Sequence, residues 1–365
     1  MKKKIVLTGG HAGTTALAVI EEIIKQGKDW DIFWIGPGKA LEGSGVPTLE
    51  ARTFPRLGVA FHPIVAGRLQ KRWTVHTVPA AVKIPFGFLH APLILSKIKP
   101  DVVLSFGGYS AVPVVIAAWL KKTPIILHEQ ITGLGLANRI SAPFARKVAL
   151  ARKEGEKHIS VKKSVLIGNP VMASVAEVRA KSKIGDPTVI FITGGSRGAQ
   201  NINKIIDYTL ADLLRDFIII HHTGELDFDY FAQKAKLLNN EFPGRYQVAS
   251  SFEPEDMADV YRQSDIIISR AGANTVSEIM VTARPAVLIP IPWSKYDEQN
   301  KNALAAKKSG LAIVMDQDNT SPKELIKAVQ KIKKNWQKMV RNMDRKLAKL
   351  DLAAASKLVS IIENQ

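Results

Sequence analysis

The residues from Ile266 to Glu278 (I-I-I-S-R-A-G-A-N-T-V-S-E) have types and spacing suited to binding an anion beside a sugar. The isoleucine run predicts a short buried strand, Gly272 ends it, and Asn274 or Thr275 could cap the helix that follows. The first amides of such a helix lack intrahelical partners and favour a phosphate. Glu278 would repel an anion, but its carboxylate can accept two hydrogen bonds from a ribose diol. The segment therefore predicts a nucleotide site; an ordinary strand–helix unit with a surface glutamate is the alternative.

Three glycine turns could bring backbone amides close to a phosphate or a polar sugar. They are T-G-G-H-A-G-T (Thr8 to Thr14), F-G-G-Y-S-A-V-P (Phe106 to Pro113) and G-G-S-R-G-A (Gly194 to Ala199). None has the G-x-G-x-x-G spacing of dinucleotide sites, and no G-x-x-x-x-G-K-S/T occurs, which argues against NAD and ATP. Tyr109 is expected to be exposed at a strand end. Tight turns between strands and helices are the alternative.

Metal binding is not expected. D-x-D strings begin at Asp29, Asp227 and Asp316, but three scattered copies in acidic loops indicate chance. The histidines have no helical metal spacing. We therefore expect neither a metal ion nor another cofactor.

The composition predicts a globular protein with an anionic partner. The chain has 365 residues, 46% apolar residues, no cysteine and a formal net charge of +18. It contains no run of 18 apolar residues, and the apolar run after its first lysines is too short for a signal peptide. The lack of cysteine excludes disulfides and fits a cytoplasmic location. The charge indicates nucleic acid, an acidic membrane surface or a phosphorylated substrate.

The basic charge is concentrated in residues 52–99, which contain no Asp or Glu. The stretch has eight cations: Arg52, Arg56, Arg68, Lys71, Arg72, Lys83, Lys97 and Lys99. The apolar segment from Ile84 to Leu95 is too short to span a bilayer but could enter its interface. Each cation near an anionic leaflet contributes about 1 kcal/mol, so this stretch predicts membrane docking. A core helix with solvated flanking charges is the alternative; nucleic acid is disfavoured because aromatic platforms are lacking.

Strand, turn and helix alternate twice along the chain. The first series predicts strands at residues 4–8, 31–35, 59–65, 102–106, 125–128 and 147–150. The second predicts strands at 188–193, 217–221, 246–250, 266–269, 286–289 and 311–315. This pattern is typical of two doubly wound α/β domains with mostly parallel sheets, whose ligands bind at the carboxyl ends of the strands beside a cleft. The boundaries are predicted at 1–163 and 164–349, with a C-terminal helix over about 350–365 that could pack on the first domain.

Several motifs together resemble the MurG family over roughly Lys4 to Met315. They are F-G-G-Y-S-A-V-P, I-I-L-H-E-Q (Ile125 to Gln130), I-G-N-P-V (Ile167 to Val171), T-G-G-S-R-G-A, and S-R-A-G-A-N-T-V-S-E with Q-N-K-N-A (Gln299 to Ala303). The resemblance implies the GT-B fold and transfer of N-acetylglucosamine from UDP-N-acetylglucosamine to lipid I, an undecaprenyl-linked acceptor. It also implies inversion at the anomeric carbon, no metal, and peripheral docking on the cytoplasmic face of the membrane.

The resemblance also implies roles for individual residues. Donor contacts would come from Gly194, Gly195, Ser196, Arg197, Pro254, Ala273, Asn274, Thr275, Val276, Ser277, Glu278 and Gln299. In this set the backbone from Ala273 to Val276 would hold the phosphates, Glu278 the ribose, and Gln299 the transferred sugar. The uracil would lie near Phe252 to Pro254. Acceptor contacts would come from Gly10, Ala12, Gly13, Thr14, Gly107, Gly108, Tyr109 and Gln130.

Four positions depart from the family pattern. The first loop reads G-G-H-A-G-T instead of G-G-T-G-G-H, so His11 stands where threonine is expected and Thr14 where histidine is expected. Ile131 and Met172 replace an expected asparagine and arginine. Either His11 acts from a shifted position, or the acceptor differs, or activity is lost.

Direct displacement of UDP needs a base for the acceptor hydroxyl, and His11 and Glu129 are the two candidates. The alternatives are a capping role for His11 and a bracing role for Glu129 on the loop Gly133 to Asn138. Two other functions remain open: a UDP-N-acetylglucosamine 2-epimerase, and a non-catalytic UDP-sugar-binding protein at the membrane.

Overall fold

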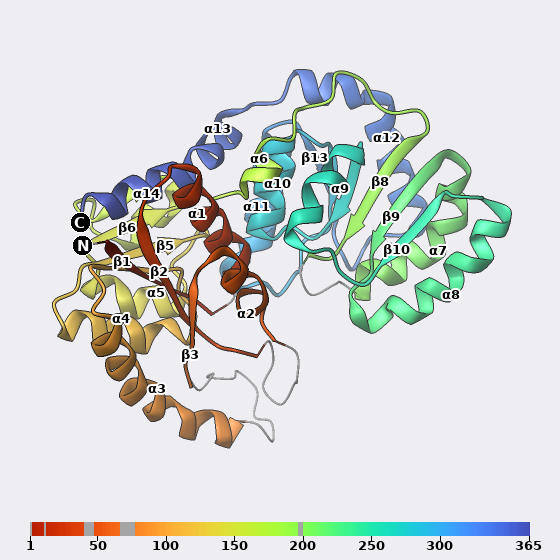
Figure 1. Cartoon of the computed structure of the whole chain (residues 1–365). Helices are drawn as coiled ribbons and strands as arrows, with labels where there is room; N and C mark the ends of the chain where they lie inside the picture. Colours follow the sequence, from red (N-terminus) through yellow and green to blue (C-terminus); the bar gives the residue numbers. More distant parts are fainter. Residues whose placement is uncertain (1, 11, 40–46, 66–76, 196–199) are drawn as a thin grey trace. The chain divides into compact units, whose positions relative to one another are not determined.

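A computed structural model of the protein describes residues 2–10, 12–39, 47–65, 77–195 and 200–365. The chain forms two compact units (Figure 1): Met1–Met172 with Ala353–Gln365, and Ala173–Leu352. The division after Met172 comes later than the predicted boundary after Lys163. The reason is that β7 (Ser164–Leu166), which lies beyond the predicted boundary, pairs with β6 (Lys147–Leu150) in the first sheet.

The first unit contains a seven-stranded sheet in the order β3-β2-β1-β4-β5-β6-β7, and all of its pairs are parallel. Its other strands are β1 (Lys3–Thr8), β2 (Trp30–Gly36), β3 (Ala60–Pro63), β4 (Val102–Ser105) and β5 (Ile125–Glu129). The central strands β4 and β5 are buried along their whole length. Continuous apolar runs are typical of parallel strands covered on both faces, which explains why the sequence pattern located them.

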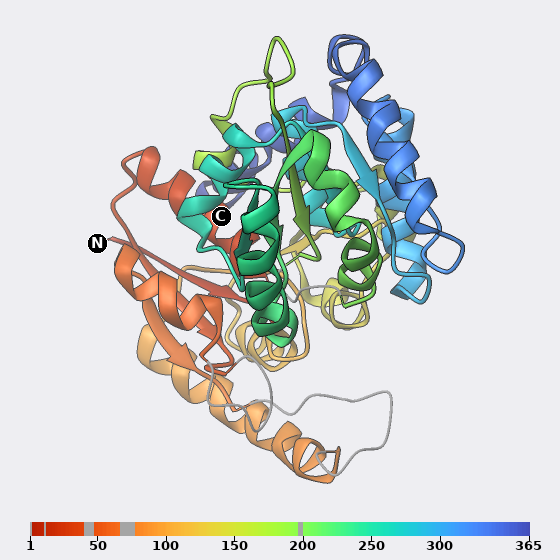
Figure 2. The same cartoon turned by 90° about the vertical axis from the view of Figure 1, so that its right-hand side faces the viewer.

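Helices cover this sheet, and one of them comes from the C-terminus. The helices are α1 (Gly13–Lys25), α2 (Leu49–Thr53), α3 (Thr77–Ile98), α4 (Ala111–Leu120), α5 (Leu136–Ser141) and α14 (Ala354–Glu363), with 3-10 turns η1 (Phe54–Leu57), η2 (Ala142–Phe144) and η3 (Lys153–His158). In both views (Figure 1, Figure 2) α3 lies beside α4. The C-terminal helix α14 packs against α1, and Lys3 Nζ donates to the Ile362 carbonyl at 2.8 Å. These contacts fix the C-terminal segment on the first unit.

The second unit contains a six-stranded parallel sheet in the order β10-β9-β8-β11-β12-β13. Its strands are β8 (Thr188–Thr193), β9 (Phe217–His222), β10 (Tyr246–Ala249), β11 (Ile266–Ser269), β12 (Ala286–Leu288) and β13 (Ala312–Val314). The central strands β8 and β11 are adjacent, with Thr193 opposite Ser269 at their carboxyl ends. Both predicted donor motifs follow these two strands.

The helices of the second unit are α6 (Ala173–Ala176), α7 (Gln200–Asp216), α8 (Glu225–Glu241), α9 (Met257–Gln263), α10 (Ala273–Thr282), α11 (Glu298–Lys308), α12 (Pro322–Arg341) and α13 (Lys346–Leu352), with η4 (Pro254–Asp256) and η5 (Lys295–Asp297). α12 begins with a capping box, as the S-P-K-E string indicates. Ser321 Oγ accepts from the Glu324 amide at 3.3 Å, and Glu324 Oε2 accepts from the Ser321 amide at 2.8 Å. Such reciprocal bonds satisfy two amides that the helix itself leaves unpaired.

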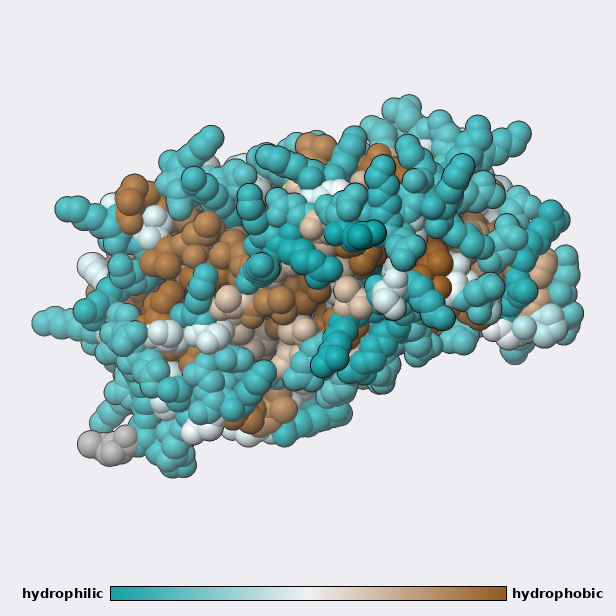
Figure 3. Space-filling model, turned by 90° about the horizontal axis from the view of Figure 1, so that it is seen from above, coloured by the Kyte–Doolittle hydropathy of each residue, from teal (hydrophilic) through white to brown (hydrophobic). Residues whose placement is uncertain are grey.

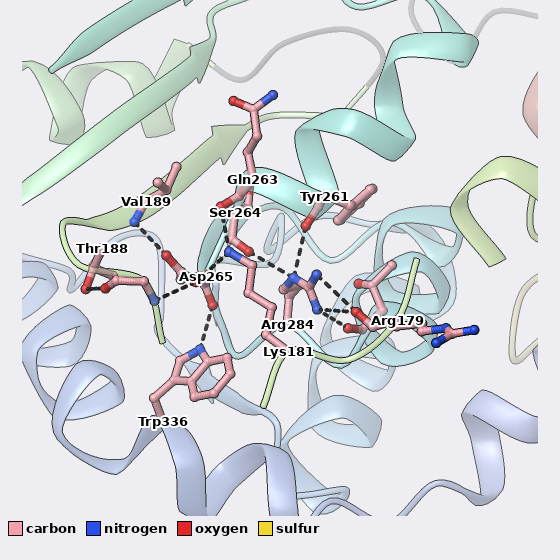
Figure 4. A network of polar contacts seen from close by, with 12 residues as sticks. Arg179, Lys181, Thr188, Val189, Tyr261, Gln263, Ser264, Asp265, Arg284 and Trp336 are labelled. Atoms are coloured by element: carbon pink, nitrogen blue, oxygen red, sulfur yellow. Dashed lines mark hydrogen bonds and ion pairs between the residues drawn. The ribbon is translucent and has the colours of Figure 1, made fainter. Parts of the chain in front are cut away.

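The amino edge of the second sheet is fixed by a polar network around Asp265 (Figure 4). Its carboxylate accepts hydrogen bonds from Lys181 Nζ at 2.7 Å, the Gly185 amide at 3.1 Å and the Val189 amide at 2.9 Å. Trp336 Nε1 donates to the Asp265 carbonyl at 2.8 Å and so ties α12 to the same point. This edge therefore has a structural role, and the carboxyl edge of the sheet is the place for a ligand.

The surface agrees with the composition. Figure 3 shows one face of the molecule, on which hydrophilic side chains surround several apolar areas. Among the described residues, no helix has the length and apolar character needed to cross a bilayer. Several large apolar side chains are exposed on α3.

Candidate functional site

The start of α10 is the clearest anion site of the second unit. Its N-cap is Gly272, in an extended conformation (φ −63°, ψ 150°), and no side chain among the described residues caps it. The predicted cap at Asn274 or Thr275 is wrong, because both residues lie inside the first turn. Val276 donates its amide to the Gly272 carbonyl at 3.0 Å, so that amide is not available to a phosphate as predicted. The amides from Ala273 onward that precede it have no partner within the helix, and no acid lies in the first turn, so an anion is favoured there.

Glu278 lies about one turn further along α10, half-buried beside Tyr261 of α9. The Tyr261 hydroxyl donates to Glu278 Oε2 at 2.8 Å. Burial raises the pKa of Glu278 to about 7, although the hydrogen bond from Tyr261 acts in the opposite direction. Among the described residues, the donor that bonds to the Glu278 carboxylate is Tyr261, and it uses Oε2. Oε1 is the oxygen that could accept a bond from a ligand hydroxyl. Ser277, another predicted donor residue, is buried beside it.

The glycine turn after β8 is held from inside the protein. Gly195 has a φ of +80°, which favours glycine, and an added Cβ would meet no atom within 4 Å. Its amide donates to Thr193 Oγ1 at 3.0 Å, and that hydroxyl lies 3.0 Å from His222 Nδ1. A donor would therefore have to contact atoms of this turn other than the Gly195 amide. Gly194 is half-buried. Two further predicted donor residues, Ser196 and Arg197, lie outside the described residues.

Gln299 and Pro254 are the remaining predicted donor residues. Gln299 Oε1 accepts from the Ile291 amide at 3.0 Å, and the Gln299 amide donates to Ser294 Oγ at 3.2 Å. These bonds fix the side chain and leave its NH₂ group as the donor for a sugar hydroxyl. Pro254 is buried at the start of η4, and Phe252 before it is half-buried. The segment predicted to lie near the uracil thus presents an aromatic ring.

In the first unit, the glycine turns after β1 and β4 contact each other. The Gly10 amide donates to the Gly107 carbonyl at 3.0 Å. Gly107 and Gly108 have φ values of +78° and +93°, and an added Cβ on Gly108 would lie 2.7 Å from Gly10 Cα. The glycines therefore permit a backbone contact between two strand ends. Ser110 Oγ donates to the Gly9 carbonyl at 3.1 Å and holds the second turn against the first.

The other predicted acceptor residues lie close to these turns. Ala12 is buried at the N-cap of α1, and Gly13 and Thr14 form its first turn. Gln130 Nε2 donates to Thr15 Oγ1 and joins the end of β5 to α1. Tyr109 is half-buried, so the prediction that it is exposed is wrong; the turn that carries it is pinned against the first turn. His11 lies outside the described residues.

Glu129 is a buried acid at the end of β5. Its Oε2 accepts from the Gly135 amide and from Asn138 Nδ2, both at 2.9 Å, and its Oε1 accepts from the Ile131 amide at 3.2 Å. Burial raises the pKa of Glu129, while these hydrogen bonds lower it. The contacts are those of an acid that braces the following loop, which is the structural alternative to the role of base.

Tyr261 and Glu50 lie against predicted site residues, and His222 contacts Thr193 directly before the donor glycine turn; none of the three belongs to a recognisable motif. Tyr261 reaches Glu278 from α9, His222 reaches Thr193 from β9, and Glu50 lies beside Gly13 from α2. Each comes from an element distant in sequence, so only the fold brings it to the site. For His222 alone the sequence offers an indication. The pair His221–His222 ends β9, and β9 pairs with β8, the strand directly before the donor glycine turn.

The departures at Met172 and Ile131 remove polar groups. Met172 is 2% exposed and belongs to the core of the first unit. Ile131 contributes its amide to Glu129, and its side chain has no donor or acceptor. Neither side chain can make the polar contact that the family pattern implies at its position.

In the described ranges, no group of three or more His, Asp and Glu side chains could hold a metal ion. Carboxylates of two D-x-D strings have internal partners: Asp227 Oδ2 accepts from Asn203 Nδ2 at 2.7 Å, and Asp316 Oδ1 accepts from the Asp318 amide at 2.8 Å. The expectation that the protein needs no metal stays a prediction.

Known proteins resemble the whole chain. Residues 5–150 match the glycosyltransferase family 28 N-terminal domain, and residues 189–359 match the family 28 C-terminal domain. The UDP-N-acetylglucosamine–N-acetylmuramyl-(pentapeptide) pyrophosphoryl-undecaprenol N-acetylglucosamine transferase of Clostridium botulinum (strain Hall) is 32% identical over 354 residues, covering 94% of this chain and 95% of that protein. The enzyme of the same name from Legionella pneumophila (strain Corby) is 31% identical over 381 residues, covering 100% and 98%.

Solved structures show the same fold. Acinetobacter baumannii MurG superposes with a TM-score of 0.70 at 24% identity, covering both chains completely. The UDP-GlcNAc 2-epimerase of Neisseria meningitidis bound to UDP-GlcNAc gives 0.69 at 14% identity, covering 99% of this chain and 100% of that one. The fold and the matched domains define a two-domain glycosyltransferase of family 28 with the GT-B fold. Within that class, the chain belongs to the MurG family.

Proposed function

We propose that the protein transfers N-acetylglucosamine from UDP-N-acetylglucosamine to undecaprenyl-diphosphate-linked N-acetylmuramoyl-pentapeptide, converting lipid I to lipid II in peptidoglycan synthesis. The observation that carries the proposal is the β11–α10 unit, where a helix start without an acid or a side-chain cap among the described residues is followed one turn later by the carboxylate of Glu278, held through Oε2 by Tyr261. Family membership and the activity named for the Clostridium relative support it.

In the proposed donor complex, the amides that begin α10 hold the diphosphate and Glu278 Oε1 accepts a ribose hydroxyl. The NH₂ group of Gln299 binds the transferred sugar, because its amide oxygen is already bonded to Ile291. Phe252 and Pro254 form the side on which the uracil lies.

The reaction is a direct displacement in which the acceptor oxygen forms a bond to the anomeric carbon as the bond to UDP breaks. Negative charge develops on the leaving diphosphate, and the fixed dipoles of the α10 amides stabilise it. The acceptor hydroxyl must also lose its proton to a base. We assign that role to His11, because the carboxylate of Glu129 is committed to its loop.

One assay tests the function and separates the alternatives. Labelled UDP-N-acetylglucosamine is incubated with the protein, with and without a lipid I analogue, and both free UDP and labelled lipid are followed. We expect stoichiometric UDP and labelled lipid only when the analogue is present. A changed sugar nucleotide without acceptor would instead indicate an epimerase. Binding without turnover would indicate a sensor, an outcome that the altered residues His11, Ile131 and Met172 make worth testing.

We assign membrane docking to α3 within residues 52–99. Ala91, Ile94, Leu95 and Ile98 pack into the core of the first unit. On another side of the same helix, Phe86, Leu89 and Leu93 recur at helical spacing and are 55%, 68% and 63% exposed. Exposed apolar side chains at such spacing are typical of a helix that enters a lipid interface.

Cations accompany this apolar row. Lys97 follows it in the last turn of α3, and Lys121 and Lys122 follow α4. Lys121 Nζ donates to Ser96 Oγ at 2.6 Å, which places the end of α4 beside the end of α3. An apolar row with cations near one end fits an anionic leaflet. Arg68, Lys71 and Arg72 lie outside the described residues. Nucleic acid is not part of the proposal.

Vesicle binding is expected to fall with salt and with substitution of the apolar row. With vesicles containing anionic lipid, the bound fraction should drop as salt shortens the screening length. Leu89→Glu and Leu93→Glu should each weaken binding about tenfold or more, because a carboxylate is disfavoured in an anionic interface. Leu226→Glu is the control, because Leu226 is 82% exposed on α8 of the second unit. Binding indifferent to salt and to the α3 variants would contradict the assignment.

A further inference from the structure

A cavity of about 580 Å³ opens at the amino edge of the second sheet, away from the donor motifs. It lies within the second unit, beside the segment 177–185 that leads from α6 into β8. Five of the side chains that line it are cations and one is an acid: Arg179, Lys181, Lys183, Arg262, Arg284 and Glu177. Its volume lies in the range of about 300–1,000 Å³ that small-molecule sites occupy. The cavity therefore has the size and the charge of a site for a small anion.

Two of these cations fix the wall of the cavity to the sheet (Figure 4). Arg284 is 1% exposed; its Nε donates to the Ser264 carbonyl at 2.9 Å, and Nη1 and Nη2 both donate to the Arg179 carbonyl at 3.3 Å. Lys181 Nζ donates to the buried Asp265 carboxylate at 2.7 Å. Because these bonds hold the wall without a ligand, a ligand would not have to order it.

The same bonds leave the cavity with an excess of positive charge. Asp265 is bonded to Lys181, whereas the bonds of Arg284 go to carbonyls. Arg179 and Lys183 are both exposed, and neither has an ion pair with another described residue. Both side chains are therefore available to an anion from outside the chain.

A second cavity of about 290 Å³ adjoins the first and extends the basic lining to α12. The two cavities share Ala180, Lys181 and Ser182, and the second is also lined by Arg341 and Arg345. Within the described ranges, these two arginines have no ion pair either. Together the cavities present cations from three separate parts of the second unit.

Basic charge is concentrated on this side of the unit and is not spread evenly over it. α12 has seven cations and a single acid, Glu324, which is bonded within the capping box. α8 of the same unit has four acids and two cations. The high net charge of the chain does not by itself explain this difference, which favours an anionic ligand at the α12 side.

The lining favours phosphate groups, and more than one of them. An arginine guanidinium matches two phosphate oxygens at once, and an ammonium group binds phosphate as a point charge. Arg179, Lys183, Arg341 and Arg345 together can neutralise several negative charges, whereas a single carboxylate would leave most of them unpaired. The chemistry fits a compact anion with two or more phosphate groups.

The position of the cavities separates them from the donor site. The segment 177–185 precedes β8 and Asp265 precedes β11, whereas the donor motifs follow these strands. β8 has six residues, so its ends lie roughly 20 Å apart. An anion in the cavities would therefore not occupy the place of the donor diphosphate.

We propose that the two adjoining cavities form a second anion site, which binds a soluble compact anion with two or more phosphate groups, such as the oligophosphate chain of a nucleotide. Arg179 and Lys183 bind it in the first cavity, and Arg341 and Arg345 bind it in the second. Because this site and the donor site lie at opposite ends of the same strands, both can be occupied at once.

The test is a calorimetric titration of the full-length protein with inorganic tripolyphosphate at saturating UDP, which fills the donor site. Lys183→Glu and Arg345→Glu reverse one charge in each cavity. Lys236→Glu is the control, because it makes the same charge change at an exposed lysine of α8 in the same unit. Thermal unfolding and UDP titration show whether each variant is folded with an intact donor site. The titration needs no turnover and is independent of the proposed function.

In UDP-saturated wild type we expect one tripolyphosphate site whose affinity falls as salt rises. Lys183→Glu and Arg345→Glu should each weaken binding about tenfold or more, because each replaces a charge-assisted hydrogen bond with repulsion. Lys236→Glu should change the dissociation constant by less than about twofold, because exposed charges far from a ligand are largely screened.

Three results would overturn the proposal. The first is the absence of a tripolyphosphate site in UDP-saturated wild type. The second is equal weakening by all three variants, which would indicate attraction by the net charge of +18 and not a built site. The third is binding to anionic vesicles that depends on Lys183 and Arg345 while tripolyphosphate binding does not, which would assign the surface to a lipid headgroup.

Discussion

Glu278→Ala is expected to weaken UDP binding by about 1–3 kcal/mol, or roughly 5- to 150-fold, because it removes the proposed acceptor of the ribose hydroxyls. The substitution also leaves the buried Tyr261 hydroxyl without the carboxylate to which it now donates at 2.8 Å. Titration calorimetry with UDP measures the change directly. Glu241→Ala, which removes an exposed acid at the end of α8, is the matched control. An unchanged dissociation constant in a folded Glu278→Ala variant would refute the assignment.

The pH dependence of donor binding gives a second readout of the same contact. Burial raises the pKa of Glu278 to about 7, so in the free protein the carboxyl takes up a proton as pH falls through that value. Only the ionised form offers Oε1 as a full hydrogen-bond acceptor, so affinity should rise as pH increases through about 7. UDP-N-acetylglucosamine suits this series because both of its phosphates are esterified and keep their charge. Glu278→Gln should bind more weakly at high pH and lose the pH dependence.

The contribution of Glu278 to folding stability should fall as pH rises, whereas its contribution to donor binding should grow. Its folded-state pKa lies above the ordinary value of 4.5, so the native state binds more protons than the unfolded state between about 4.5 and 7. The contribution of this group to stability is therefore present below that window and is lost as pH rises through it. Ligand binding that strengthens while stability declines is the combination expected of a buried acid kept for function.

The order of elements could be predicted because parallel strands are short apolar runs that end in glycine turns. β8, β6 and β11 begin and end where the sequence pattern indicates. β7 could not be predicted, because Ser164–Leu166 is a three-residue, half-buried edge strand between lysines and a Gly-Asn-Pro turn. When this strand is not recognised, the charged residues around it indicate a linker, and the predicted domain boundary falls before β7.

The candidate site was predictable at the level of strand ends and not at the level of hydrogen bonds. Glycine after a buried strand places a loop at the carboxyl edge of a sheet whatever else the fold does, which located Gly195 and the start of α10. The direction of an amide depends on backbone angles that the sequence does not determine. Hence the amides of Gly195 and Val276, predicted to face the donor, bond to Thr193 and Gly272.

His11→Ala is expected to lower turnover about 10²–10⁴-fold while UDP affinity stays unchanged, because general-base catalysis acts on the acceptor hydroxyl and not on donor binding. Initial rates at saturating donor and acceptor give the turnover, and calorimetry gives the UDP affinity. His11→Gln is the companion variant, because glutamine can replace a capping hydrogen bond but cannot accept a proton near neutral pH. A capping role would thus be rescued by Gln, whereas a catalytic role would not.

Glu129→Gln separates the two candidates for the base. A glutamine at this position turns an NH₂ group toward the Gly135 amide, Asn138 Nδ2 or the Ile131 amide, so at least one donor meets another donor. Such a mismatch costs about 1–3 kcal/mol of folding stability, so we expect Glu129→Gln to lower the unfolding temperature. Near-normal turnover by Glu129→Gln, measured below that temperature, would indicate that His11 is the base that takes the proton of the acceptor hydroxyl. The reverse result, with normal turnover in His11→Ala and a stable but inactive Glu129→Gln, would give the base role to Glu129. Its three hydrogen bonds would then have to loosen when the acceptor binds, because apo contacts at an active site often rearrange in the substrate complex.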